Sequence, residues 1–156
     1  MKYQICKFTP EYQVQAAGLL VAFCIEYGVN YNYQTIHKNL NKFYTDNNAV
    51  IVICLCGLEV VGIAVGYKTI SLFDEATTQF AELAWFVTKE HRGSKAGYLL
   101  FKELEQSADC NYLHMIEPPN SDVGKFYLKH GFQKFETFYS KKLEGVKVGR
   151  NEGKIF

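Results

Sequence analysis

The sequence predicts a single domain of the α/β class, more narrowly α+β, in which four helices flank a mixed, mostly antiparallel central sheet of about six to seven strands. The 156 residues are 48% hydrophobic and 15% aromatic, which is enough for one packed core. Three apolar, β-branched runs follow one another in the middle of the chain. Segments with helical spacing precede and follow these runs, which indicates helices on both sides of the central strands.

The N-terminal third is expected to hold one strand and two helices. "KYQICKF" alternates as a strand, and Pro10 ends it and opens a helix. Weaker helical spacing in "NYNYQTIHKNLNKFYTDNN" predicts a second helix that ends at the Asp-Asn-Asn turn. We expect the first helix to bury one stripe, made of Val14, Ala17, Leu20, Val21, Cys24 and Ile25.

The central runs predict three adjacent strands. "AVIVICLCGLEVVGIAVGYKTI" has the pattern of an antiparallel hairpin, and "TTQFAELAWFVT" supplies the third strand. A helix from Ser94 to Ala108, a strand in "NYLHMI", a helix in "SDVGKFYLKHG" and a strand in "FQKFETFYSKKL" follow. The expected order is β-α-α-β-β-β-α-β-α-β within one domain, 1–156, of which 144–156 form either a loose tail or an added edge strand.

Composition argues against several classes of partner. Seventeen Lys and Arg against sixteen Asp and Glu leave a net charge of +1, so we expect no nucleic-acid or membrane partner. The sequence has neither a bilayer-spanning apolar run nor the apolar core of a secretory signal, which predicts a cytoplasmic protein. Five cysteines without a CxxC pair and four scattered histidines predict no metal site.

A basic, glycine-containing turn, "HRGSKAGYLL", lies between the third central strand and the next helix. Free backbone N–H groups and the positive end of the helix dipole make such a turn suitable for a phosphate group. Gly93 and Gly97 allow close approach of the backbone, and Arg92 and Lys95 add charge. By itself, the pattern also fits a solvated capping turn. Neither GxxxxGK[ST] nor GxGxxG is present, which argues against nucleoside triphosphates and dinucleotides.

Two blocks of the chain resemble the GNAT family of N-acetyltransferases, and the resemblance runs from the first strand to about residue 143. The family's coenzyme loop has the form Arg/Gln-x-x-Gly-x-Gly/Ala; Arg92 and Gly97 match its ends, and Lys95 replaces the middle glycine. "NSDVGKFYLKHGF" is similar to the family's Asn-x-x-Ala-x-x-x-Tyr-x-x-x-Gly-Phe segment. There, Asn120 and Tyr127 match, whereas a valine stands in place of the alanine.

The resemblance implies an enzyme that moves an acetyl group from acetyl-coenzyme A, its co-substrate, to a primary amine by direct transfer in a ternary complex. The pantetheine arm would enter between the strands "FAELAWFV" and "NYLHMI". A backbone N–H near Val87 would hold the thioester oxygen. The implied coenzyme site consists of Phe86, Val87, Arg92, Gly93, Ser94, Lys95, Ala96, Gly97, Asn120, Phe126 and Tyr127.

Two residues are expected to carry the chemistry. Tyr127 lies where the family keeps the tyrosine that protonates the coenzyme A sulfur, and a phenol with a pKa of about 10 stays protonated at neutral pH; a core tyrosine is the alternative. Glu82 lies in an otherwise apolar strand, so it either reaches an open cleft as the general base or meets a structural partner. Glu117, just past the fifth strand, is the reserve base or a plain loop carboxylate.

The acceptor site is expected near the junction of the first two helices, the region that walls this site in the family. Glu26, Tyr27, Tyr31 and Glu117 are its expected residues, although aromatic packing between the helices would explain the tyrosines equally well. The sequence does not identify the amine, and it leaves open whether the protein is a monomer or a homodimer. The alternative function is a non-catalytic coenzyme A-binding or protein-interaction module with the same fold.

Overall fold

The computed structural model describes residues 1–143, and the segment expected to be a tail or an edge strand, 144–156, lies outside the described residues. The described strands form one sheet and are β1 (Tyr3–Lys7), β2 (Ala49–Cys56), β3 (Glu59–Ile70), β4 (Thr78–Val87) and β5 (Tyr112–His114). The described α-helices are α1 (Gln13–Tyr27), α2 (Tyr33–Tyr44), α3 (Lys95–Ser107) and α4 (Val123–Lys129). Short 3₁₀ turns precede α1 and α3, namely η1 (Pro10–Tyr12) and η2 (Lys89–His91).

The sheet has the order β1-β2-β3-β4-β5, and its only parallel pair among the described residues is β4 with β5. The antiparallel pairing of β3 with β4 shifts where Val65 faces Ala84 and Gly66 faces Glu82. Leu83 is therefore the extra residue of a β-bulge, a feature that bends a strand and redirects its side chains. The bulge lies next to Glu82, the candidate base.

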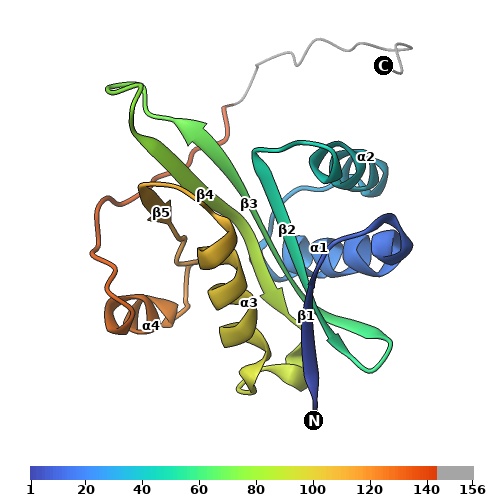
Figure 1. The fold of residues 1–156 in the computed structure, drawn as a ribbon. Helices are drawn as coiled ribbons and strands as arrows, with labels where there is room; N and C mark the ends of the chain where they lie inside the picture. Colours follow the sequence, from blue (N-terminus) through green and yellow to red (C-terminus); the bar gives the residue numbers. More distant parts are fainter. Residues whose placement is uncertain (144–156) are drawn as a thin grey trace.

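Helices cover both faces of the sheet: α1 and α2 lie on one face, and α3 lies on the other (Figure 1). Successive residues of a strand point to opposite faces, so Ile53 of β2 packs under α1 and α2, whereas Cys54 packs under α3. Both of these side chains are fully buried. Burial on both faces explains why the central runs are almost continuously apolar instead of alternating.

The stripe expected on α1 is only partly correct. Ala16, Ala17 and Leu19 are the buried residues of this helix, whereas Val14 and Ile25 are 69% and 65% exposed. The sequence from 14 to 25 is almost entirely apolar, so the spacing alone could not select the packed face. The two alanines let the helix lie close to the sheet, which a face of larger side chains would prevent.

The prediction of a strand at 132–143 is wrong. This segment forms no strand, and the sheet of the described residues has five strands instead of six to seven. Its Phe135, Phe138 and Tyr139 side chains are all exposed. Alternation indicates which side chains would share a face, but a strand also needs a neighbouring edge for its backbone hydrogen bonds. The edge strand, β5, offers only three residues. No described helix is long and apolar enough to cross a membrane.

Candidate active site

The candidate active site begins where β4 and β5 separate. The two strands pair at only three positions, the last of which joins Ala81 to His114. Beyond this pair, the Glu82 carboxylate accepts a hydrogen bond from the Ile116 N–H at 3.0 Å. The Tyr127 hydroxyl of α4 donates to the Ile116 carbonyl oxygen at 2.9 Å. The backbone of one residue therefore holds both side chains that the sequence assigned to catalysis.

Glu82 is a buried carboxyl group without a cationic partner among the described residues. Glu82 is 5% exposed. Burial raises the pKa of its carboxyl group to about 7, although the hydrogen bond from the Ile116 N–H opposes this shift. The structural partner that the sequence left open is thus a backbone N–H and not a Lys or Arg side chain. A carboxyl group with a pKa near 7 exchanges protons readily at neutral pH, as a general base must.

Tyr127 is 7% exposed and lies among aromatic rings, with Trp85 and Phe132 at centroid distances of 6.1 and 5.4 Å. Burial raises its pKa well above the usual value, and the charges of Glu82 and Glu117 add to the effect. The phenol therefore stays protonated at neutral pH and keeps a proton to donate. Packing and proton donation are compatible here, because the ring is buried while the hydroxyl reaches the Ile116 carbonyl oxygen, just past β5.

The turn between β4 and α3 combines a left-handed glycine with a serine-capped helix N-terminus. Gly93 adopts φ +75°, a conformation that favours glycine. Ser94 is the N-cap of α3: its hydroxyl accepts from the Ala96 N–H at 3.2 Å and donates to the His91 carbonyl oxygen at 2.5 Å. Lys95, at the family's middle-glycine position, is exposed and begins the helix.

Arg92 and Glu26 form a bidentate ion pair, although the sequence placed them in different parts of the site. The guanidinium donates to the two Glu26 carboxylate oxygens at 2.8 and 2.6 Å. Its Nε donates to the Val87 carbonyl oxygen at 2.8 Å, and its centre lies 5.1 Å from the centroid of the Phe86 ring. The pair lowers the pKa of Glu26 and ties the end of α1 to the end of β4.

Glu117, the reserve base, is occupied at the start of α4. Its carboxylate accepts from the Gly124 N–H at 2.9 Å. A Cβ added at Gly124 would lie 2.7 Å from both carboxylate oxygens, so only glycine leaves room for this contact. Asn120 turns the preceding loop with φ +60°, a conformation that asparagine tolerates better than most residues.

The tyrosines expected at the acceptor site lie in different environments. Tyr27 packs on Phe23 at a centroid distance of 4.9 Å, and its pKa is raised by burial and by the charges of Glu26 and Glu82. Tyr31 is exposed and does not belong to the packed pair of Tyr27 and Phe23. Part of the expected aromatic wall is therefore core packing, and part faces solvent.

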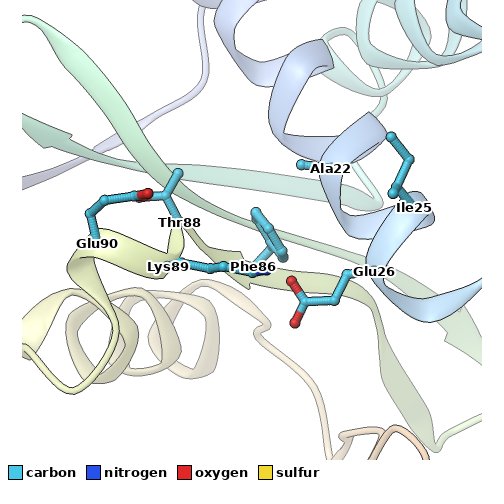
Figure 2. Close-up of a pocket in the computed structure, with 7 residues that line it drawn as sticks. All are labelled: Ala22, Ile25, Glu26, Phe86, Thr88, Lys89 and Glu90. Carbon is cyan, nitrogen blue, oxygen red and sulfur yellow. The ribbon is translucent and has the colours of Figure 1, made fainter.

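A cavity of about 340 Å³ lies between α1 and the end of β4. Figure 2 shows the Phe86 ring rising from β4 toward α1, with the Glu26 carboxylate beside it. The cavity is lined by Ala22, Ile25, Glu26, Phe86, Thr88, Lys89 and Glu90. Only Glu26 and Phe86 were expected at a site; the others were missed because nothing in their local sequence shows that α1 crosses β4 at this point.

Two further residues of the site were missed by sequence reasoning. Ile116 contributes only its backbone, so no side-chain pattern could have indicated it. Trp85 could have been noticed as the chain's single tryptophan, and it lies between α3 and α4. Within the described residues, no three His, Cys, Asp or Glu side chains gather as metal ligands would.

A family model decides the identity of this arrangement. The model described as "Acetyltransferase (GNAT) family" matches residues 19–132, which include the β4–α3 turn, Glu82 and Tyr127. The chain belongs to the GNAT family of acetyltransferases. As a GNAT protein it is an acyltransferase, and the co-substrate of its family is acetyl-coenzyme A.

Solved structures show the same GNAT fold at low sequence identity. A probable acetyltransferase is 20% identical with a TM-score of 0.72, covering 90% of this chain and 96% of that one. Glucosamine-6-phosphate N-acetyltransferase from Arabidopsis thaliana is 12% identical with a TM-score of 0.75, at 92% and 100% coverage. AAC(6')-Iy, in complex with the bisubstrate analog CoA-S-monomethyl-acetylneamine, is 12% identical with a TM-score of 0.74, at 92% and 100% coverage. A comparison with curated proteins gives no match.

Proposed function

We propose that the protein is an N-acetyltransferase that moves the acetyl group of acetyl-coenzyme A directly to a primary amine while both substrates are bound. The observation that carries this proposal is the joint attachment of Glu82 and Tyr127 to the Ile116 backbone, where β4 and β5 separate. The Glu82 carboxylate can accept a proton, and the Tyr127 hydroxyl can donate one. Both groups lie where β4 and β5 separate. Direct transfer requires that combination.

The residues around the separation suit the coenzyme. The β4–α3 turn offers a helix N-terminus behind Gly93, whose positive φ keeps the turn tight. Gly97 presents bare backbone in the first turn of α3, and a Cβ there would lie at an ordinary contact distance of 3.8 Å from Trp85 and Val87. Acetyl-coenzyme A would supply an activated thioester, whose phosphates the turn would hold while its sulfur lies near Tyr127.

Each protein group then has one task. Ionised Glu82 takes a proton from the acceptor ammonium, directly or through a water molecule, and leaves a neutral amine as the nucleophile. A backbone N–H near Val87 stabilises the negative charge that develops on the carbonyl oxygen. Tyr127 donates its proton to the departing sulfur. The nitrogen loses a second proton as the tetrahedral intermediate collapses, and this proton restores the Tyr127 hydroxyl. The proton held by Glu82 passes to solvent, so each turnover releases one proton.

The test is a thiol-release assay with a panel of amines: polyamines, amino sugars, aminoglycosides, and peptides with free N-termini or lysine side chains. The panel is broad because two of the similar structures are those of a glucosamine-6-phosphate N-acetyltransferase and of an enzyme in complex with CoA-S-monomethyl-acetylneamine. With an accepted amine, we expect Glu82→Gln, a nearly isosteric change, to lower kcat by roughly 10²-fold or more. Normal turnover by this variant would remove Glu82 from the role of base.

A non-catalytic coenzyme A-binding or protein-interaction module remains the second candidate, favoured by Lys95 at the family's middle-glycine position. Isothermal titration separates the two functions. Coenzyme A binding without thiol release from any member of the panel would support the module. Thiol release that depends on Glu82 would support the enzyme.

A further inference from the structure

Trp85 lies along the path between the phosphate-binding turn and Tyr127. Its ring is 6.1 Å from the Tyr127 ring, 5.7 Å from the Phe126 ring and 6.0 Å from the Phe101 ring. At the other end, its Cζ2 atom would lie 3.8 Å from a Cβ at Gly97. The indole therefore extends from the first turn of α3, above the phosphate-binding turn, to the candidate general acid on α4.

The indole N–H of Trp85 has no hydrogen-bond partner within residues 1–143. Its Nε1 atom is buried, and none of the described residues supplies an acceptor for it. Nε1 belongs to the same edge of the ring as Cζ2, the atom that faces Gly97. Leaving a buried donor unpaired is costly, and such groups in native proteins commonly await a ligand or a water molecule.

We propose that the Trp85 indole N–H donates a hydrogen bond to an amide carbonyl of the coenzyme's pantetheine arm, and that Trp85 is thereby a coenzyme-positioning residue. This inference rests on the proposed function. Between its phosphates and its sulfur, the arm carries two amide groups, and their carbonyl oxygens are the acceptors that a donor-only indole requires. An arm that runs from the turn at 92–97 to Tyr127 passes this edge of the ring.

The arm reaches Nε1 only if one of the covering rings turns aside. Phe126 is suited to this movement because it is only partly buried, whereas Phe101 is fully buried and Tyr127 is nearly so. Rotation of side chains at a binding site is common even where the backbone stays fixed. If Trp85 instead only packs, the face of a neighbouring aromatic ring would be the partner of its N–H, a weak interaction that needs no ligand.

The single tryptophan makes this inference directly testable in the unmodified protein. The chain gives one indole ¹H–¹⁵N resonance, and all tryptophan fluorescence comes from Trp85. Titration with coenzyme A should move the indole proton resonance to lower field and change the fluorescence emission. Adenosine 3′,5′-bisphosphate, which lacks the pantetheine arm, should bind with much smaller changes in both signals.

Trp85→Phe removes the donor and keeps an aromatic ring. We expect roughly three- to tenfold weaker binding of coenzyme A by calorimetry, the loss of one neutral hydrogen bond, and unchanged affinity for adenosine 3′,5′-bisphosphate. Tyr98→Phe is the matched control, since Tyr98 also packs on Phe126 but is exposed; its affinity for coenzyme A should not change.

The outcomes separate this inference from the function on which it rests. If coenzyme A binds but leaves the indole resonance unmoved, or binds Trp85→Phe as tightly as the native chain, the inference is wrong and the proposed function stands. If neither coenzyme A nor the bisphosphate binds the native chain, both fail. The resonance experiment needs no variant, so poor folding of Trp85→Phe would not prevent a decision.

Discussion

At the scale of single residues, Glu82 has the environment that most constrains the mechanism. Its carboxyl group is buried between β4 and the chain that follows β5, and its only described hydrogen bond is to the Ile116 N–H. Burial favours the protonated form, whereas catalysis as a base needs the ionised form. The two requirements predict opposite responses of stability and activity to pH.

Stability should fall as the pH rises from about 4.5 to about 7. The pKa of Glu82 is about 7 in the folded protein and near 4.5 when unfolded, so the folded state holds the proton more tightly, and its advantage is lost as the carboxyl group ionises. The loss is on the order of 3 kcal/mol. Chemical unfolding across this range should show it in the native chain and not in Glu82→Gln. Identical pH profiles for the two proteins would contradict the assignment.

Activity should change in the other direction. Since Glu82 must be ionised to accept a proton, kcat/KM should rise as the pH passes through about 7. The acceptor amine also loses its proton with rising pH, so Glu82→Gln, with the same acceptor, is the necessary control. A rise that persists unchanged in this variant would belong to the amine alone.

Tyr127→Phe separates proton donation from packing. The ring contacts with Trp85, Phe126 and Phe132 should survive, whereas the hydroxyl and its bond to the Ile116 carbonyl oxygen are lost. We expect kcat to fall by ~10²-fold or more, coenzyme affinity to stay nearly constant, and stability to drop by about 1 kcal/mol. Thiol-release kinetics and thermal unfolding measure these quantities. Unchanged turnover would identify Tyr127 as a core residue only.

At the scale of secondary-structure elements, the Arg92–Glu26 pair connects α1 to the β4–α3 turn across the end of the sheet. Both side chains are only partly buried, which limits the strength of the pair, but the guanidinium also holds the Val87 carbonyl oxygen and lies over Phe86. Arg92 thus contacts Glu26, Val87 and Phe86, and these contacts hold the turn in its shape. We therefore expect Arg92 to act on coenzyme binding indirectly.

Arg92→Ala and Glu26→Ala should therefore weaken coenzyme A binding to a similar extent, by about 1 kcal/mol, and the double variant should be no weaker than either single one. The effect should decrease with added salt, which screens a partly exposed pair. Isothermal titration of the four proteins at two salt concentrations measures it. A loss confined to Arg92→Ala would show that the ion pair does not support the turn, and that Arg92 acts through Val87 and Phe86 or through the coenzyme itself.

At the scale of the whole molecule, most of the architecture follows from local patterns. Apolar runs around "CGLE" predicted the β2–β3 hairpin, and the strand-turn-helix pattern around Arg92 predicted the start of α3, because both depend on residues close in sequence. The prediction of a sixth strand at 132–143 was wrong, because a strand must pair with a sheet edge that is distant in the sequence. The prediction of the buried face of α1 was only partly correct, because nearly every residue in the middle of this helix is apolar.

In the candidate site too, local sequence patterns predicted single residues but not the contacts between them. The family motif indicated Tyr127, and the otherwise apolar strand indicated Glu82; both side chains contact the backbone of Ile116. Their contact through Ile116, the pairing of Arg92 with Glu26 and the capping of α4 by Glu117 join residues between 7 and 66 positions apart. Such contacts follow from the course of the whole chain, which no local pattern contains.

The alternation of side chains along the last part of β4 has a consequence for how such a protein can change over time. Trp85 faces α3 and α4, whereas its neighbour Phe86 faces α1 and the cavity beside it. Adjacent positions in the gene therefore shape opposite sides of the sheet. If the acceptor occupies the α1 side, substitutions there can alter which amine is accepted while the coenzyme's side keeps its shape. Apart from Glu26, whose ion pair with Arg92 reaches the β4–α3 turn, residues that shape the two substrate sites can then change independently, with one strand of backbone as the shared boundary.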